Sequence, residues 1–134
     1  ALREEVARLR REGTEAEIRA ATARATQAGM RADRSRLYYG RQTFPWQLQG
    51  IRLGPVALIC IPGEPFTEIN QQICARSPFP ITLFSGYSNG AFSYLPVKSA
   101  YAEGGYEVET SPFSPDAAEI VVEEAVRMLH ELYA

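Results

Sequence analysis

Histidine and cysteine, the side chains that build many catalytic and metal centres, are scarce in this chain. Its 134 residues include one histidine, His130, and two cysteines, Cys60 and Cys74. A cation near a helix C-terminus is favourable, so His130 favours a capping or surface role and gives no support for a Ser-His-Asp triad. The cysteine spacing matches no zinc or Cys-x-x-Cys pattern. We expect two small buried thiols, or a disulfide only if their Cα atoms approach closely enough.

Long apolar runs and familiar hydrolase motifs are missing as well. No run approaches the ~20 residues that a membrane-spanning helix needs, so no transmembrane segment is expected, and no signal peptide is visible. Gly-x-Ser-x-Gly, Walker A and His-Glu-x-x-His motifs do not occur. The chain begins at Ala1 and not at Met, so a leader could have been lost with an earlier segment. The lack of a visible signal peptide therefore does not indicate where the protein is located.

A strong net charge is also lacking, although the charge is uneven along the chain. The formal net charge is -2. Residues 1–41 carry ten arginines and six acids, whereas the rest carries four basic and ten acidic residues. A basic arm could bind nucleic acid or a membrane surface. Because these arginines are interleaved with glutamates, the pattern is more typical of a solvated helix face, and nucleic acid is an unlikely partner.

The first third of the chain has helical patterns. Residues 2–12 show apolar residues at helical spacing, and the Thr14/Glu17 pair is a capping-box pattern that predicts a second helix to about Met30. The following segment to residue 46 is predicted to be irregular. Its aromatic side chains are expected to pack on the core: Tyr38, Tyr39, Phe44 and Trp46. We therefore expect a helical arm and irregular segment over 1–44, and an α/β portion over 45–134.

The α/β portion is expected to contain a small mixed sheet with a βαβ crossover and a long C-terminal helix. The predicted strands are 48–53, 56–61, 81–85 and, at an edge, 106–109. Gly54-Pro55 predicts a hairpin between the first two strands. The crossover helix spans 66–76, and its apolar flanking runs predict parallel strands buried on both faces. Ser114-Pro115-Asp116 predicts the start of the last helix, with Ser114 as its cap.

Two polar loops follow the predicted parallel strands and would meet at one sheet edge, where ligands bind in open α/β sheets. Glu64 stands in the first loop and Tyr94 closes the second. Glu64 could be an acid in a first helical turn, or a metal ligand or general base. Glu68, one turn on, is the competing carboxylate. Tyr94 could be a packed aromatic whose hydroxyl finds one partner.

A set of short motifs in this portion resembles a known enzyme family. The motifs are Ile51-Arg52-Leu53-Gly54, Ile61-Pro62-Gly63-Glu64, Gly86-x-x-Asn89 with Tyr94, then Tyr101 and Gly105-Tyr106-Glu107. In order and spacing they resemble the neutral/alkaline (non-lysosomal) ceramidases, most of all the shorter bacterial type. The resemblance covers about 47–115, and nothing diagnostic stands in 1–40.

The resemblance implies part of a zinc amidase that cleaves the N-acyl bond of ceramide. In that family zinc is held by two histidines, a glutamate and a tyrosine, and the last two correspond to Glu64 and Tyr94. The histidines belong to earlier parts of the family chain and have no counterpart here. The chain thus resembles the C-terminal portion of the catalytic domain, completed by an upstream half or a companion chain. The substrate would be an N-acyl amide, with a sphingolipid as one option.

Two oxygen ligands without imidazole make a poor zinc site, because zinc favours nitrogen and sulfur donors and usually needs three protein ligands. We therefore expect the isolated chain to bind zinc weakly and to hydrolyse nothing. The alternative is a non-catalytic α/β module with an interaction or regulatory role. Convergence of Glu64 and Tyr94 on one cavity would favour the enzyme reading.

Overall fold

The structure is a computed structural model that describes residues 1–90 and 92–134, apart from the side chain of Arg34. The chain divides into two compact units, Ala1–Gln42 and Thr43–Ala134. Each unit is described by itself below. None of the described helices combines the length and the apolar character that a bilayer-spanning helix needs.

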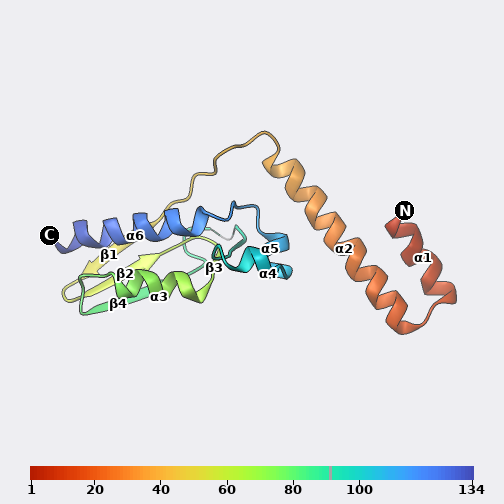
Figure 1. The fold of residues 1–134 in the computed structure, drawn as a ribbon, viewed down its shortest axis with the longest axis horizontal. Helices are drawn as coiled ribbons and strands as arrows, with labels where there is room; N and C mark the ends of the chain where they lie inside the picture. Colours follow the sequence, from red (N-terminus) through yellow and green to blue (C-terminus); the bar gives the residue numbers. More distant parts are fainter. Residues whose placement is uncertain (91) are drawn as a thin grey trace. The chain divides into compact units, whose positions relative to one another are not determined.

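The first unit is a pair of helices, α1 (Leu2–Glu12) and α2 (Glu15–Tyr38) (Figure 1). The predicted capping box is present: the Glu17 amide donates to Thr14 Oγ1 at 3.4 Å, and the Thr14 amide donates to Glu17 Oε2 at 2.8 Å. The predicted end of α2 near residue 30 was wrong, because the helix continues through the Arg- and Ala-rich segment. It ends just before Gly40, whose φ of +73° suits glycine.

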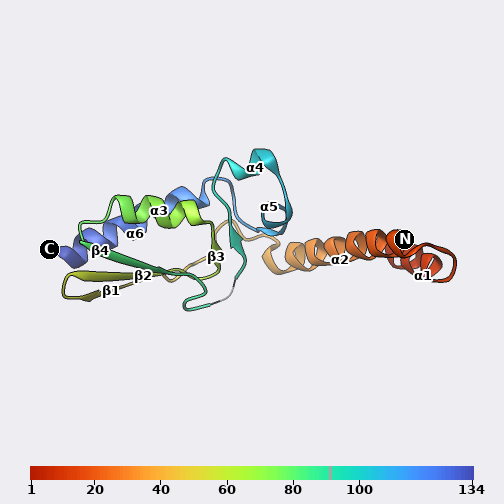
Figure 2. The ribbon, with the colours of Figure 1, turned by 90° about the horizontal axis from the view of Figure 1, so that it is seen from below.

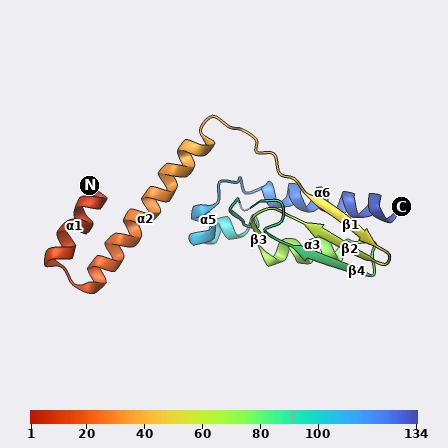
Figure 3. The same ribbon diagram turned by 180° about the vertical axis from the view of Figure 1, so that it is seen from behind.

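The second unit contains a three-stranded sheet in the order β1-β2-β4 (Figure 3). Its strands are β1 (Gln49–Leu53), β2 (Val56–Cys60) and β4 (Ile81–Ser85). The predicted hairpin is confirmed, since β1 and β2 pair antiparallel. The crossover is confirmed too, because β2 and β4 pair in parallel through α3 (Thr67–Ala75). The mixed α/β fold expected from the sequence is therefore correct.

Two helices cover one face of this sheet, α3 and α6 (Ala117–Tyr133) (Figure 2). The fully buried residues of this layer include Ala57, Ile59, Ile69, Ile73, Ala125 and Leu129. Gly50 lets α6 approach closely, because a Cβ there would lie 2.6 Å from Leu132 Cδ1. Arg52, two residues after Gly50, donates from its guanidinium to the Leu132 carbonyl at 2.7 Å and so caps the last turn of α6.

The opposite face of the sheet carries aliphatic side chains that the described residues of the second unit leave uncovered. Side chains alternate between faces along a strand, so residues two apart share a face. Leu53, Ile81 and Leu83 are 66%, 51% and 52% exposed. The register places Val56 beside both Leu53 and Ile81, and Leu58 beside Leu83. The expectation that these strands are buried on both faces was wrong for this chain by itself.

Residues 106–109 are not an edge strand. They lie in a short helix, α5 (Tyr106–Thr110). Four alternating residues are also compatible with one helical turn, and here Tyr106 and Thr110, four apart, share a helix face. Thr110 is buried, and its carbonyl accepts a hydrogen bond from Ser93 Oγ at 3.0 Å. The contact with the neighbouring segment therefore selects the helix.

The start of α6 also differs from the prediction. Ser114 does not cap the helix; its carbonyl accepts the Ala117 amide at 3.0 Å, and α6 begins at Ala117. Asp116 occupies the N-cap position without a side-chain capping bond. Its carboxylate accepts instead from Lys98 Nζ at 2.6 Å. Its backbone, at φ -89° and ψ -2°, also lacks the extended conformation that a capping side chain normally requires.

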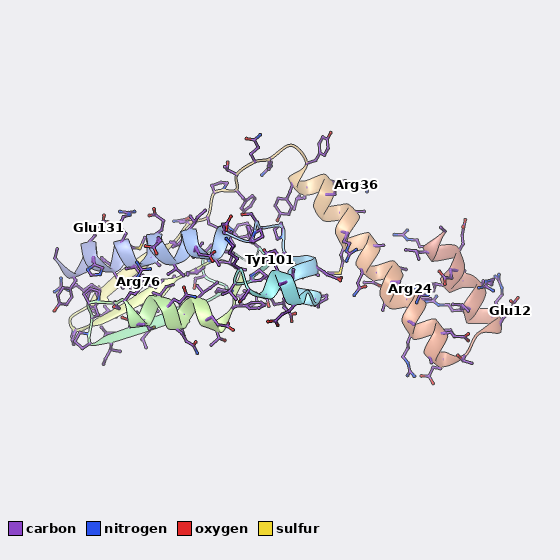
Figure 4. All side chains as sticks on the ribbon, viewed as in Figure 1. Glu12, Arg24, Arg36, Arg76, Tyr101 and Glu131 are labelled. Carbon is purple, nitrogen blue, oxygen red and sulfur yellow. The ribbon has the colours of Figure 1, made fainter. Side chains whose placement is uncertain are left out.

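A short helix, α4 (Ala100–Glu103), precedes α5, and the hydroxyl of Tyr101 ties it to the chain before α6 (Figure 4). That hydroxyl donates to the Phe113 carbonyl at 2.9 Å. Trp46 packs against the core of this unit, as predicted, whereas Tyr39 belongs to the other unit and is 87% exposed. Both cysteines are free thiols; Cys60 is buried, but Cys74 is only half-buried, and burial raises the pKa of its thiol.

Candidate functional site

Glu64 and Tyr94 lie directly beside one another. They belong to two very short parallel strands, β3 (Glu64–Pro65) and β5 (Tyr94–Leu95), whose register pairs Glu64 with Tyr94. Paired residues in neighbouring strands present their side chains on the same face. Residues thirty positions apart in the sequence are therefore brought to one point at the end of β2 and β4.

A tight turn sets this register. Gly63 has φ +79°, and a Cβ there would lie 2.5 Å from the Ser93 carbonyl oxygen, so only glycine fits. The Gly63 amide donates to the Gly90 carbonyl at 3.1 Å, and the Glu64 amide donates to the Ser93 carbonyl at 2.8 Å. The loop after β2 and the loop after β4 are thus joined backbone to backbone, and this junction holds Glu64 in place.

The first-turn interpretation of Glu64 was wrong. Helix α3 begins at Thr67, and its N-cap is Phe66, so Glu64 precedes the helix altogether. Glu68 is the acid of the first turn. Glu64 is therefore free of the capping role that would explain an acid at this point, and its carboxylate faces tyrosines instead.

Two tyrosines, Tyr87 and Tyr94, line the same cavity as Glu64. A hydrogen bond to Glu64 is the main reason that the pKa of Tyr94 is raised. The same interaction raises the pKa of Tyr87 to about 12, with desolvation and the negative charge of Glu64 adding to the effect. Both phenols therefore lose their protons at a higher pH than an ordinary tyrosine.

Tyr87 was missed by the sequence reasoning, although it stands inside the Gly86-x-x-Asn89 motif that was singled out. Its own signal was weak, because a tyrosine in a polar loop is commonplace. Only the fold shows that the loop after β4 turns back toward Glu64. The Tyr94 ring also meets the Tyr106 ring edge-on, with centroids 6.0 Å apart.

These residues line a cavity of about 730 Å³ at the ends of β2 and β4. Three carboxylates line the cavity, those of Glu64, Glu68 and Glu107. Its wall also includes Tyr87, Tyr94, Phe66 and Phe84. An acidic and aromatic cavity of this volume is large enough to bind a small molecule. A basic side chain is missing from the described part of its lining.

The donor set fits zinc only in part. A carboxylate and a phenol are two oxygen ligands, whereas zinc sites usually have three protein ligands with nitrogen or sulfur among them. Within residues 1–90 and 92–134, no three His, Cys, Asp or Glu side chains are grouped to hold a metal ion. His130 lies in the last turns of α6 and does not line the cavity. Glu64 and Tyr94 therefore offer two oxygen donors, and the described residues group no nitrogen or sulfur donor with them.

A solved structure described as a ceramidase complexed with C2 is similar to part of this chain. The two superpose with a TM-score of 0.58 and 25% sequence identity over 64% of this chain. The match spans only 14% of the ceramidase chain. No protein-family model matches this chain, and the comparison with curated proteins gives no match. The likeness is therefore to a small portion of a much larger ceramidase.

Proposed function

We propose that this chain is the C-terminal part of the catalytic domain of a ceramidase-like, zinc-dependent hydrolase of N-acyl amides, with sphingolipid amides as candidate substrates. The pairing of Glu64 with Tyr94 carries the proposal. It joins a carboxylate and a phenol beside a cavity, in a fold that is similar to part of a ceramidase. The similarity to the ceramidase structure supports the proposal that this chain is part of such a catalytic domain. The paired oxygens of Glu64 and Tyr94 support the proposal that the domain binds a metal.

Each residue has a separate role in the proposed site. Glu64 supplies a carboxylate oxygen and Tyr94 a phenolic oxygen to the metal. A bound zinc ion supplies the polarisation of an amide carbonyl and the activation of water. The remaining ligands come from an upstream half of the same protein or from a companion chain, so the isolated chain is inactive.

Zinc titration of the isolated chain tests whether its site is incomplete. We expect no tight binding by calorimetry, because two oxygen donors are too few for zinc. A submicromolar dissociation constant would contradict the incomplete site.

The complete protein, with its upstream half or companion chain, tests the ligand set. Glu64→Ala should abolish hydrolysis of an N-acyl amide and remove the zinc, measured as metal bound per protein. Glu68→Ala is the matched control, because Glu68 lines the same cavity but is not paired with Tyr94. The control should keep its zinc. Unchanged zinc in Glu64→Ala excludes Glu64 from the ligand set.

The substrate class needs its own measurement. The complete protein is assayed with a ceramide and with a simple N-acyl amide that lacks the sphingoid base. Faster cleavage of the ceramide supports a sphingolipid substrate, and cleavage of the simple amide alone restricts the proposal to small N-acyl amides.

A second candidate is a non-catalytic interaction module, favoured by the position of the Glu64 carboxylate beside the phenols of Tyr87 and Tyr94. Phenols can satisfy a carboxylate without any metal. In that case Glu64→Ala lowers the stability of the isolated chain, and the complete protein contains no zinc at this position. Zinc content thus separates the two candidates.

A further inference from the structure

The uncovered face of the sheet, opposite α3 and α6, is built in regular rows (Figure 2). Residues two apart on a strand share a face, and the register aligns them across β1, β2 and β4. Two adjoining rows are entirely aliphatic: Leu53, Val56 and Ile81, then Ile51, Leu58 and Leu83. The third row consists of Gln49, Cys60 and Ser85. None of these nine residues carries a charge.

The third row is closed by the loop that follows β4. Asn89 in this loop donates from its side-chain amide to Gln49 Oε1 at 3.2 Å, and Cys60 is buried. The two aliphatic rows extend away from that loop toward the β1–β2 turn. Three of their six side chains are more than half exposed. The open part of the uncovered face is therefore its aliphatic part.

This composition differs from that of a sheet surface in water. A sheet with one solvated face normally places apolar residues toward the core and polar residues toward water. In β2 both faces are apolar, because the buried Ala57 and Ile59 alternate with Val56 and Leu58. A single exposed apolar residue, such as Ile120 on α6, is ordinary on a protein surface. A continuous aliphatic face is instead typical of a sheet that a further layer covers.

The size of the two aliphatic rows indicates what kind of layer covers them. Neighbouring strands lie about 4.8 Å apart, and residues two apart lie about 6.7 Å apart along a strand, so the rows occupy roughly 200 Å². A stable complex of separate proteins buries about 800 Å² on each partner. By themselves the rows are thus too small to hold a second copy of this chain, and they fit a layer supplied by the rest of one domain.

The comparison and the position of the rows identify that layer. In the similar ceramidase the matching portion belongs to a much longer chain, since it makes up only 14% of it. The uncovered face also adjoins the candidate site, because the loop that closes its third row contributes Tyr87 to the cavity wall. A layer on the two rows therefore lies on the strands whose ends carry the cavity of Glu64 and Tyr94.

We propose that the two aliphatic rows are the docking surface for the polypeptide that completes the ceramidase-like catalytic domain. That polypeptide packs on them as a further apolar layer. The identity of this occupant rests on the proposed function, which requires additional zinc ligands from outside the described residues. The proposal adds the surface on this chain that the completing polypeptide contacts.

Hydroxyl-radical labelling of the complete protein, read by mass spectrometry, tests the surface. Leu53, Ile81 and Leu83 should lose the labelling that they show in the isolated chain. Ile120 is the internal reference and should stay labelled, because it is 63% exposed and lies on α6. Retained labelling of the three residues in the complete protein would overturn the proposal. Their protection in a dimer of the isolated chain would also overturn it, since a second copy would then cover the face.

A charged substitution tests the same surface through stability. Leu83→Lys should lower the melting temperature of the complete protein, because the covering layer would bury an unpaired ammonium group. Ile120→Lys is the matched control and should leave the melting temperature unchanged. Equal melting temperatures of the two variants and the wild type would exclude a covering layer.

Zinc content separates this proposal from the proposed function. Protected rows in a complete protein whose zinc is unaffected by Glu64→Ala refute the proposed function and keep the docking surface. Zinc that is lost in Glu64→Ala, together with fully labelled rows, refutes the docking surface alone.

Discussion

The two units of this chain are stabilised by different means. In the arm, Ala1–Gln42, the buried hydrophobic residues are Val6 and Ala21, and polar contacts such as the capping box and the Glu5–Arg24 pair accompany them. In the α/β unit a contiguous cluster of buried aliphatic residues joins the sheet to α3 and α6. Burial of large side chains contributes far more free energy than surface ion pairs. The α/β unit therefore owes its stability mainly to its buried core, whereas the arm relies more on local helix signals such as the capping box.

The largest expected effect is in the core of the α/β unit. Ile59→Ala should lower the free energy of unfolding by about 2–5 kcal/mol, because Ile59 is 0% exposed and its loss leaves a cavity. Trp46 is the only tryptophan and lies in this unit, so its fluorescence in denaturant follows the unit alone. Leu53→Ala, on the uncovered face, should change stability by under about 0.5 kcal/mol. Equal losses of unfolding free energy in Ile59→Ala and Leu53→Ala would mean that the uncovered face contributes as much to stability as the core.

The next effect concerns the arm. Thr14→Ala removes the capping box and should destabilise α2 by about 1 kcal/mol. Amide hydrogen exchange in α2 should then quicken about fivefold. Thr26→Ala is the matched control, because Thr26 is exposed within the same helix and alanine is the better helix former. That control should slow exchange slightly, and acceleration in both variants would contradict the capping role.

A smaller effect is expected at alkaline pH, in the α/β unit. Hydrogen bonding to Glu64 raises the pKa of Tyr87 from 10.0 to about 12, so the unfolded chain loses this proton first. The resulting stabilisation is present below pH 10.0 and is lost as the pH rises toward about 12. Solvent screening keeps it small, because Tyr87 is largely exposed. Unfolding of the wild type and Tyr87→Phe, followed by Trp46 fluorescence, should converge over this range; a constant difference would contradict the assignment.

The smallest effects are expected at exposed ion pairs. Glu5→Gln removes the 3.0 Å pair with Arg24 in the arm, and Glu123→Gln removes the two-bonded pair of Arg76 between α3 and α6. Each should cost under about 1 kcal/mol, with the two-bonded pair at the upper end. Amide hydrogen exchange in the arm measures the effect of Glu5→Gln. Denaturant unfolding of the α/β unit measures the effect of Glu123→Gln. A loss above about 2 kcal/mol at either would show that charge, and not burial, separates the two units.

Sequence patterns predicted the parts of the fold in which local signals and tertiary packing agree. The apolar run of β2, the Gly54-Pro55 turn and the stripe of α3 all indicated the correct elements. The prediction of an edge strand over residues 106–109 was wrong, because a four-residue alternation does not distinguish a strand from a helical turn. The prediction of Ser114 as the cap of the last helix was wrong, because α6 begins only at Ala117 and Asp116 occupies the N-cap position.

The candidate site was predictable only in outline. The two loops were expected at one edge because parallel strands end together. The pairing of Glu64 with Tyr94 depends on the Gly63 turn meeting Ser93 and Gly90, which is a tertiary event. The left-handed backbone of Tyr87, with φ +53°, is a conformation that tyrosine rarely adopts and that no local pattern predicts. The function of Glu64 and Tyr94 as metal ligands remains a prediction that the zinc measurements address.

The uncovered aliphatic face of the sheet has a consequence for how this polypeptide behaves in solution. Ile81 and Leu83 belong to β4, an edge strand whose outer backbone groups have no neighbouring strand among the described residues, and Leu53 belongs to β1 at the other edge. An apolar face beside an open edge is a template for aggregation, and no lysine or proline in Ile81–Ser85 discourages it. Expressed alone, the chain should therefore be poorly soluble. Leu83→Lys should raise its soluble yield while leaving the helix-covered core unchanged.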